Sequence, residues 1–427
     1  MTTSQITASI MRRHWLPLKR RRSRGDVRWL STEGMIILCS GRFPANAEVT
    51  VNIDAPDHRQ STTPIIDATA ERLGTDEARL TINGDHDAEH SGYMDHAAAL
   101  KTFVEEVGTY LSDLAGIGHR VVHGGESFAE SVLIDSTTLA QLEETCRLAP
   151  LHNPMNLMGI RLCQELVADV PNVAVFDTAF HQSIPKENFL YGVPYDWYTE
   201  HQVRRYGFHG SSYRFISAEA GRRLECPADE LNLIVAHLGN GCSACAIRQG
   251  RSVDSSMGLT PLEGLIMGTR SGDTDPGLIN YMMENTGRSA SELTNDLNRE
   301  SGLKGLSGIS NDMRTLLAEE ASGNADAARA INAFCFRVAR QLAALSCNLS
   351  STDAVIFTGG IGEHAADIRR RILAAWRNIP FRLSSELNEK NGDDTGRISA
   401  QGAPLVLVIP TDEERMIAED TYELVSQ

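Results

Sequence analysis

The sequence has no long hydrophobic run. None of its apolar stretches reaches the roughly 18 residues that a membrane-spanning helix needs, so we do not expect a membrane protein. The first residues also lack the apolar segment of a secretory signal, which leaves the cytoplasm as the expected location. A hydrophobic content of 41% and a charged content of 22% are ordinary for a soluble globular protein, and 427 residues suffice for about two or three domains.

Basic residues are fewer than acidic ones, 40 against 56. The formal net charge is −16, which argues against nucleic acid as a partner, because binding to phosphate backbones calls for a basic surface. Residues 1–30 are the exception, since they hold eight basic residues and a single acidic one, Asp26. Three interpretations of this segment stay open: a disordered basic arm that could bind nucleic acid, a transit peptide, or residues foreign to the fold.

The eight cysteines form no disulfide or metal framework. They are scattered, and most lie within apolar patterns, as expected for thiols that serve as small hydrophobes in a reducing compartment. Cys242 and Cys245 match the CxxC spacing. However, they lie in a strand-like alternation and no second CxxC follows, so we expect neither redox nor zinc chemistry there.

Alternating strand and helix patterns begin at about Glu71. Apolar residues recur at helical spacing over 95–114, and strand-like runs end in glycine turns or a carboxylate at 116–125, 172–177 and 354–363. The longest helix is expected at about 325–348, and Thr411 and Glu414 have the spacing of a capping box before a final helix. This order predicts an α/β protein. Residues 1–70 show no sustained periodicity.

The stretch 231–276 combines two strand-like runs with glycine-rich turns. Asn240, between Gly239 and Gly241, joins the runs in a pattern typical of a β-hairpin. The glycines would also let backbone N–H groups turn toward a phosphate. Arg270, in a second glycine-flanked turn, could hold phosphoryl oxygens through its planar guanidinium. We interpret the stretch as a phosphate cradle, with an ordinary surface hairpin as the alternative.

Four more residues could take part in chemistry. Asp177 ends a buried strand, where open α/β sheets place their sites, although it could equally cap the next turn. His209 could stabilise a developing charge or only satisfy a core hydrogen bond, and Arg120 lies beside a glycine turn. Glu413 could hold Mg²⁺ through water or merely favour its helix dipole. Together they suit phosphoryl transfer, which requires positioning and charge neutralisation.

Nine motifs closely resemble those of the acetate kinase family, in the family's order and spacing over about residues 71–427. They are GHRVVHGG (118–125), APLHNP (149–154), VFDTAFHQSIP (175–185), YGFHGSS (206–212), HLGNGCS (237–243), SMGLTPLEGLIMGTRSGDTDPG (256–277), SGISNDMR (307–314), FTGGIGE (357–363) and IPTDEERMIA (409–418).

This resemblance implies the fold shared by acetate and sugar kinases, heat-shock chaperones and actin, in which two ribonuclease-H-like α/β domains enclose a cleft. We expect an N-terminal domain at 71–178 that is joined by the C-terminal helix 412–427, and a nucleotide-binding domain at 179–411, with 1–70 an atypical basic segment. The implied reaction is reversible phosphoryl transfer between ATP and acetate, which yields acetyl phosphate and ADP. A homodimer that uses Mg²⁺, or possibly Mn²⁺, is also implied. One methylene changes binding in an apolar pocket by only about 1–3 kcal/mol, so propionate is an expected second substrate.

Roles follow residue by residue from the same resemblance. The catalytic residues would be Asp177, His209 and Arg270, with His152 a further neighbour of the phosphate. The acetate site would consist of Arg120, Val122, Leu151, Phe208 and Pro261. ATP would be held by His237, Leu238, Gly239, Asn240, Gly241, Asp312, Met313, Arg314, Gly360, Ile361, Gly362, Glu363 and His364. Glu413 would hold the metal.

The sequence departs from the family at its start. The family begins with a strand and an Asn-x-Gly-Ser-Ser-Ser-x-Lys phosphate loop, and nothing in 1–70 matches that loop; the corresponding place reads IILCSGRF (36–43). Tyr213 and His364 also replace the residues usual at their positions. We hypothesise that about the first 65–70 residues are an out-of-frame or rearranged replacement. Sequencing the gene tests this, since an alternative frame without the Ser-rich loop would refute it. A catalytically impaired member of the family is therefore the alternative function.

Overall fold

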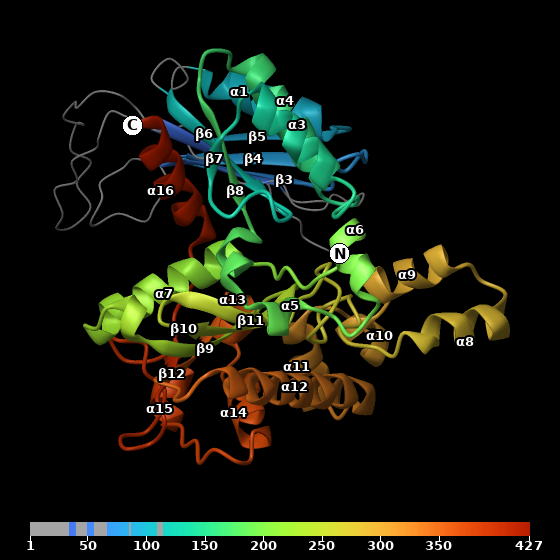
Figure 1. Cartoon of the computed structure of the whole chain (residues 1–427), viewed down its shortest axis with the longest axis vertical. Helices are drawn as coiled ribbons and strands as arrows, with labels where there is room; N and C mark the ends of the chain where they lie inside the picture. Colours follow the sequence, from blue (N-terminus) through green and yellow to red (C-terminus); the bar gives the residue numbers. More distant parts are fainter. Residues whose placement is uncertain (1–33, 40–48, 55–65, 85–86, 109–113) are drawn as a thin grey trace. The chain divides into compact units, whose positions relative to one another are not determined.

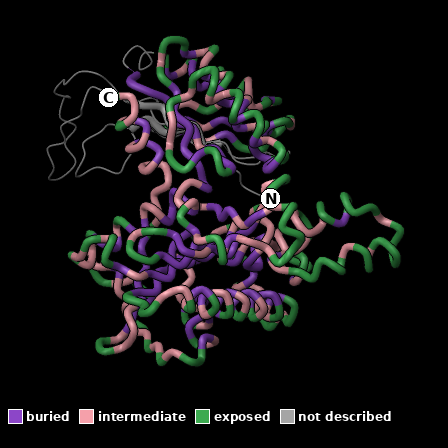
Figure 2. Tube along the Cα trace, viewed as in Figure 1, coloured by how far each residue is buried: buried purple, intermediate pink, exposed green. Residues whose placement is uncertain are grey.

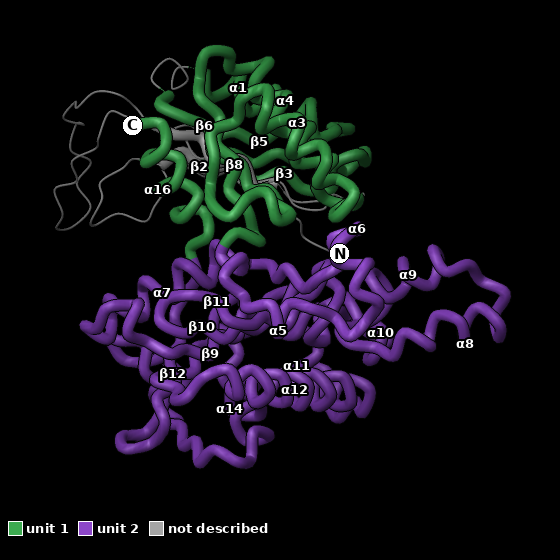
Figure 3. The backbone as a smooth tube through the Cα atoms, in the orientation of Figure 1, with its two compact units in different colours: residues 1–179, 412–427 green, residues 180–411 purple. Residues whose placement is uncertain are grey.

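The computed structural model describes residues 34–39, 49–54, 66–84, 87–108 and 114–427, which form two compact units (Figures 1 and 3). Unit 1 contains the described residues up to Ala179 together with Asp412–Gln427, and unit 2 is Phe180–Thr411. Unit 1 also contains described residues before residue 71, which the sequence analysis placed in a separate segment.

Unit 1 is built on a sheet of eight strands in its described part, in the order β5-β4-β3-β2-β1-β6-β8-β7. The strands β1, β6 and β8 are parallel, and β1 to β5 form an antiparallel meander. The bounds are Gly34–Cys39 (β1), Val49–Asp54 (β2), Ile66–Glu71 (β3), Arg79–Gly84 (β4), Ala88–Ser91 (β5), Leu114–Val121 (β6), Val132–Leu133 (β7) and Asn172–Phe176 (β8).

The expectation that regular structure starts only near Glu71 is wrong, because β1, β2 and β3 all involve earlier residues. The strand β2 does alternate apolar and polar residues (VTVNID), but this run is only six residues long, and pairing with neighbours on both sides stabilises these strands. The basic cluster of residues 12–28 lies outside the described residues, as does the second half of the IILCSGRF stretch.

Helices pack on both faces of this sheet. Alternate residues of β8 face opposite sides, so Val173 and Val175 contact α16 while Ala174 and Phe176 join a core with α3 and α4. The bounds of the helices in this unit are His96–Glu106 (α1), Ser136–Thr145 (α3), Asn153–Leu166 (α4) and Glu413–Val425 (α16).

The close approach of α16 to β6 depends on a glycine. A Cβ atom at Gly118 would lie 2.4 Å from the Thr421 hydroxyl oxygen and 2.7 Å from a methyl carbon of Ile417. Any side chain there would push the helix outward. The C-terminal helix is thereby seated beside the strand that carries Arg120. The N-terminal cap of α16 differs from the expectation. Asp412, not Thr411, is the cap, and its carboxylate accepts from the N–H of Arg415 at 3.0 Å. The helix therefore begins one residue later than a Thr411 cap implies.

Unit 2 contains a five-stranded sheet in the order β11-β10-β9-β12-β13, in which β9, β12 and β13 are parallel. Its core joins β9, β10 and β12 to α7. The strands are Asn232–Leu238 (β9), Cys242–Arg248 (β10), Arg251–Ser255 (β11), Ala354–Thr358 (β12) and Val406–Val408 (β13). The helices are Lys186–Phe189 (α5), Tyr195–His201 (α6), Gly210–Leu224 (α7), Gly277–Thr286 (α8), Ala290–Arg299 (α9), Gly302–Ser307 (α10), Met313–Ala321 (α11), Ala325–Leu345 (α12), Gly359–His364 (α13), Ala366–Ala375 (α14) and Ser385–Glu389 (α15).

The seven cysteines from Cys146 to Cys347 are free. Burial raises the pKa of the Cys242 thiol to about 12 and also raises that of Cys245, so both stay protonated at neutral pH. This protonation is consistent with the expectation that the CxxC match carries no redox chemistry, because thiolates are the reactive form. Among the helices that the structure describes, none is long and apolar enough to cross a membrane.

Candidate active site

Arg120 and Asp177 meet at adjacent strand ends in unit 1. The parallel register of β6 and β8 pairs Arg120 with Val175, and Asp177 follows two residues later. The Nε and Nη2 atoms of Arg120 each donate to one oxygen of the Asp177 carboxylate, both at 2.7 Å. Asp177 is 2% exposed, and its backbone N–H donates to the Val121 carbonyl at 3.0 Å. The result is a fixed, bidentate, charge-assisted pair.

Glu413 approaches the same guanidinium from the first turn of α16. Its Oε2 lies 3.6 Å from Nη1 of Arg120, so two carboxylates flank one arginine. Within the described ranges, no group of three or more His, Cys, Asp or Glu side chains is arranged as a metal site. Two carboxylates do fit Mg²⁺, however, because that ion usually binds one or two carboxylates and takes its other ligands from water and substrate phosphates.

Two buried amides support the chain beside Arg120, and the sequence did not single them out. Asn156 accepts from the N–H of Val122 at 3.1 Å, and Asn153 accepts from the N–H of His123 at 3.2 Å. Both lie near the start of α4, in and just after the APLHNP motif. No sequence pattern marks an asparagine whose side chain takes the place of a backbone carbonyl as a hydrogen-bond acceptor. Only the folded structure reveals this role.

The residues expected to line an acetate pocket are divided between the units. Val122 is buried and Leu151 is 50% exposed in unit 1, where His152 is also buried. Phe208 and Pro261 belong to unit 2; Phe208 is buried, and the Pro261 carbonyl accepts from Nη1 of Arg270 at 3.0 Å.

His209 is held in a left-handed backbone conformation, with φ of 59°, immediately before α7. Its Nδ1 lies 2.8 Å from the Ser243 hydroxyl, and its ring stacks on that of His237 with centroids 4.2 Å apart. His237 is held separately, because its Nδ1 lies 2.9 Å from the hydroxyl of Ser212. The two imidazoles are thus oriented by different serines.

His209 and Arg270 converge on Gly241. The expected hairpin is confirmed, since β9 and β10 are antiparallel and Gly239–Gly241 form the turn. A methyl group added at Gly241 would lie 3.6 Å from Nε2 of His209 and 3.7 Å from Nη1 of Arg270. The glycine therefore leaves room for a small group between an imidazole and a guanidinium. This hairpin has the chemistry of an anion cradle.

A neighbouring turn braces this hairpin. Asn311 donates to the side-chain oxygen of Asn240 at 3.1 Å, and this contact was not predicted. Asp312 caps α11, and its Oδ2 lies 2.6 Å from Nη2 of Arg314. The side chain of Met313 is only 3% exposed. Met313 thus belongs to the core.

The glycine-rich segment after β12, which was expected to be a turn, is the short helix α13, and a carboxylate and a buried arginine hold it in place. Glu363 accepts from the N–H groups of Gly359 and Thr411, at 2.8 and 3.2 Å. The fully buried Arg369 donates to the carbonyls of Gly362 and Glu363, at 2.8 and 2.7 Å. Ile361 is half-buried, whereas Gly360 and His364 are exposed and open to a ligand.

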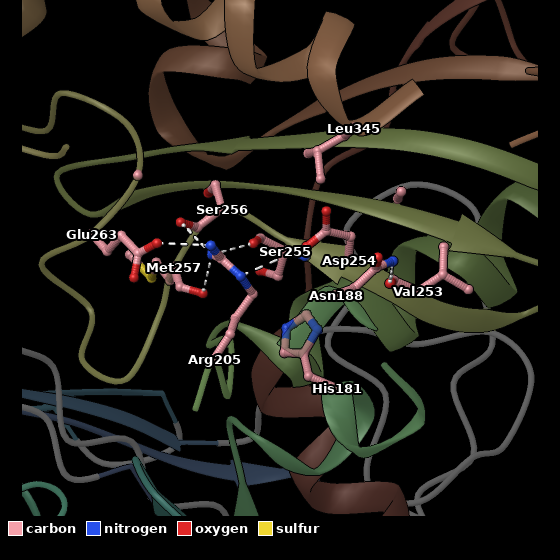
Figure 4. A network of polar contacts seen from close by, with 12 residues as sticks. His181, Asn188, Arg205, Val253, Asp254, Ser255, Ser256, Met257, Glu263 and Leu345 are labelled. Atoms are coloured by element: carbon pink, nitrogen blue, oxygen red, sulfur yellow. Dashed lines mark hydrogen bonds and ion pairs between the residues drawn. The ribbon is translucent and has the colours of Figure 1, made fainter. Parts of the chain in front are cut away.

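Arg205 organises the segment that leads to His209 (Figure 4). Its Nη1 donates to the carbonyls of Ser255, Ser256 and Met257 at 2.7 to 3.1 Å, and its Nη2 binds Glu263 at 2.7 Å. The sequence did not single it out, because the arginine beside it leaves no sign of which side chain makes these contacts. It ties the chain before the YGFHG turn to the strand end at 255–257.

His181 reinforces the same turn. Burial lowers its pKa to about 4, so the imidazole is neutral at physiological pH. Its Nε2 lies 3.0 Å from the Phe208 carbonyl, which accepts a hydrogen bond from it, and its Nδ1 lies 2.7 Å from the Ser252 hydroxyl. The residue before His209 is thereby fixed.

A bidentate arginine–aspartate pair lies in one α/β unit, and an imidazole and a guanidinium lie around a glycine turn in the other. The acetokinase family model matches residues 50–419, which is 20 residues before the point where the sequence motifs indicated family resemblance. The chain belongs to this family.

Curated acetate kinases are similar over most of their length. That of Stutzerimonas stutzeri is 50% identical over 333 residues, which cover 78% of this chain and 84% of the relative. That of Geobacillus kaustophilus is 46% identical over 364 residues, covering 83% and 92%.

Solved structures confirm the predicted fold class. A propionate kinase from Francisella tularensis superposes with a TM-score of 0.85 at 36% identity, covering 99% of this chain and all of that one. The acetate kinase of Porphyromonas gingivalis gives a TM-score of 0.82 at 31% identity, with the same coverage.

Proposed function

We propose that the protein catalyses reversible phosphoryl transfer between ATP and acetate, forming acetyl phosphate and ADP, and that it also accepts propionate. Family membership supports the reaction class. The observation that carries the proposal is the Arg120 fork, which already holds a carboxylate, that of Asp177, through two 2.7 Å hydrogen bonds. A guanidinium arranged in this way suits recognition of the acetate carboxylate.

In unit 1, Arg120 would orient acetate, and Asp177 and Glu413 would bind the metal. The two carboxylates flank Arg120, so a substrate carboxylate that draws the guanidinium away would free oxygen ligands for a divalent cation. The bound cation, Mg²⁺ or Mn²⁺, would neutralise charge on the phosphates of ATP. Asp177 would also help to orient the attacking carboxylate, and His152 would lie near the phosphate.

In unit 2, His209 and Arg270 would bind the phosphoryl group during transfer. Both face the space at Gly241, and hydrogen-bond donors fixed before the reaction stabilise developing charge without reorganisation. The hairpin 237–241, the start of α11 at 312–314 and residues 360–364 of α13 would hold ATP. Within these sets, Glu363 and Met313 would act as supports rather than ligand contacts, because their described contacts are with the protein.

An assay of phosphoryl transfer on the full chain tests this function. With ATP and Mg²⁺ present, ADP formation should require acetate, and hydroxylamine should trap acetyl phosphate in equal amount. Propionate should support turnover within roughly tenfold of acetate, since one methylene is worth about 1–3 kcal/mol. A folded chain that binds a fluorescent ATP analogue but forms no acetyl phosphate would favour the catalytically impaired alternative.

A homodimer is part of the proposal, and α8 is the surface that suggests it. No residue of this helix is buried, although its sequence GLINYMMENT carries a single charged side chain (Figure 2). Leu278 is 37% exposed and Tyr281 is 63% exposed. A second copy would cover this apolar helix.

Replacing Tyr281 by glutamate should therefore weaken self-association. Sedimentation velocity should show a dimer for the wild-type chain and a shift toward monomer for Tyr281→Glu, because a buried unpaired charge at an interface is costly. Arg248→Glu, an exposed change on the end of β10, serves as the control. A wild-type monomer, or an unchanged dimer in Tyr281→Glu, would contradict the use of α8. We also propose a cytoplasmic location, because ATP is the phosphoryl donor and the thiols are free.

A further inference from the structure

We propose that Tyr213 is a positioning residue, which acts through Ser243 to keep the proton of the His209 imidazole on Nε2, the nitrogen that faces Gly241 and Arg270. The inference rests on the proposed function for its catalytic meaning, but its structural content is independent of that function. Neither Tyr213 nor Ser243 was singled out for chemistry by the sequence.

Three side chains, from α7, its N-cap and β10, form a continuous series of hydrogen bonds. The Tyr213 hydroxyl, from α7, lies 2.5 Å from the Ser243 hydroxyl on β10. The same serine oxygen lies 2.8 Å from Nδ1 of His209. Tyr213 and Ser243 are both fully buried, whereas His209 is partly exposed. This series of hydrogen bonds therefore runs from the buried core of unit 2 to the partly exposed imidazole of His209.

The backbone holds His209 and Tyr213, the two ends of this series of hydrogen bonds, close together. His209 precedes the first turn of α7, and the N–H of Tyr213 donates to the His209 carbonyl at 3.0 Å. His209 is the N-cap residue of α7 rather than a helical residue, and its side chain and that of Tyr213 both reach Ser243. The left-handed conformation of His209 turns its ring back toward β10. Only a specific backbone geometry produces this convergence.

The direction of the hydrogen bonds decides the tautomer. A serine hydroxyl has one proton, so it can donate to Nδ1 or to the tyrosine oxygen, but not to both. A phenol is the better donor and an imidazole nitrogen the better acceptor, so the favoured order is Tyr213 to Ser243 to Nδ1. An Nδ1 that accepts leaves the proton of a neutral imidazole on Nε2.

That tautomer is the useful one at this site. A methyl group at Gly241 would lie 3.6 Å from Nε2, so the proton on Nε2 points to the space shared with Arg270. There it can donate to a phosphoryl oxygen without a second positive charge beside the guanidinium. The other titratable or charged groups around His209 are His237 from β9, stacked on its ring, and Arg270 from the turn after Met267.

Tyr213→Phe tests the proposal, with Tyr206→Phe as the matched control. Tyr206 is equally buried, and its hydroxyl donates to the Gln202 carbonyl at 3.1 Å, away from the serine. We expect kcat to fall roughly tenfold in Tyr213→Phe, the lower end of the effect of removing a partner that orients a functional histidine. The KM values for ATP and acetate should be unchanged, and the pH profile of kcat should shift. Tyr206→Phe should match Tyr213→Phe in thermal stability but retain wild-type kcat.

Nitrogen NMR of the labelled histidine supplies a readout that does not need activity. The wild-type His209 signal should show a protonated Nε2, and Tyr213→Phe should show a mixture of tautomers. Ser243→Ala should reproduce the kinetic loss, and the double variant should lose no more than either single one, because the two hydroxyls act as one unit. A wild-type tautomer signal in Tyr213→Phe would overturn the proposal, as would independent, additive losses. If the wild-type chain has no acetate kinase activity, the proposed function fails while the NMR result still decides this inference.

Discussion

Asp177→Asn should lower kcat about 10²- to 10³-fold, the usual cost of removing one charge-stabilising group. The substitution keeps the shape of the side chain but removes a negative charge that both oxygens share with Arg120. An asparagine can accept only one of the two hydrogen bonds, so Arg120 should also become misaligned for acetate, and KM for acetate should rise. Initial rates at saturating ATP, measured over a range of acetate and Mg²⁺ concentrations, separate these effects.

Glu320→Gln is the matched control for this experiment. Glu320 holds Arg371 through the same bidentate geometry, at 2.8 and 2.7 Å, but in unit 2 and among residues with no proposed role in the reaction. Both variants should lose about 2 kcal/mol of stability, because each weakens a charge-assisted pair. Only Asp177→Asn should lose activity. Equal activity in the two variants would show that the Arg120–Asp177 pair is structural.

Gly241→Ala should reduce kcat/KM for ATP by about 10²-fold or more, the scale of loss when reacting groups are displaced by about 1 Å. The added methyl group would lie between the His209 and Arg270 nitrogens at ordinary contact distances of 3.6 and 3.7 Å. The fold should therefore tolerate it, and Gly241 has no positive φ angle that would strain an alanine. The methyl group would exclude a phosphate oxygen from the space that the two donors face. Equilibrium binding of an ATP analogue and steady-state kinetics provide the measurement.

Gly159→Ala is the control for the glycine replacement. Gly159 lies inside α4, where an added Cβ has nothing within 4 Å, so alanine should stabilise the helix slightly and leave kinetics alone. If Gly241→Ala keeps full activity while folded, the space at Gly241 is not the phosphoryl site. Loss of folding instead would appear as an altered melting temperature relative to Gly159→Ala.

Elements with strong local signals were predictable. The Asn-Gly turn between apolar runs identified the β9–β10 hairpin, and the regular apolar spacing identified α12, which ends at Leu345 and continues as a 3₁₀ turn. The strand that ends at Asp177 was also visible, because five consecutive buried residues read as one apolar run. Local propensity and burial agree in these segments.

The rest depended on contacts that no local pattern encodes. Asn153 and Asn156 act on a strand about 30 residues earlier in the chain, and Arg205 binds a turn about 50 residues later. Met313, which is expected at the nucleotide site, is buried by packing that no local pattern predicts. The strands before Glu71 pair with residues across the sheet, as β1 does with β6. Such features follow from tertiary structure, so they become visible only when the chain is folded.

The helix α16 has a consequence for the order in which the protein can be assembled during synthesis. Unit 2 is one uninterrupted segment, Phe180–Thr411, whereas unit 1 needs residues from both sides of it. During synthesis, all of unit 2 is translated before α16. This helix contains Glu413 and the residues that cover Gly118, Val173 and Val175. Until then, one face of the central strands lacks its helix and Arg120 lacks one of its two carboxylates. Unit 2 can therefore fold before unit 1 is complete, and Arg120 gains its second carboxylate only near the end of translation.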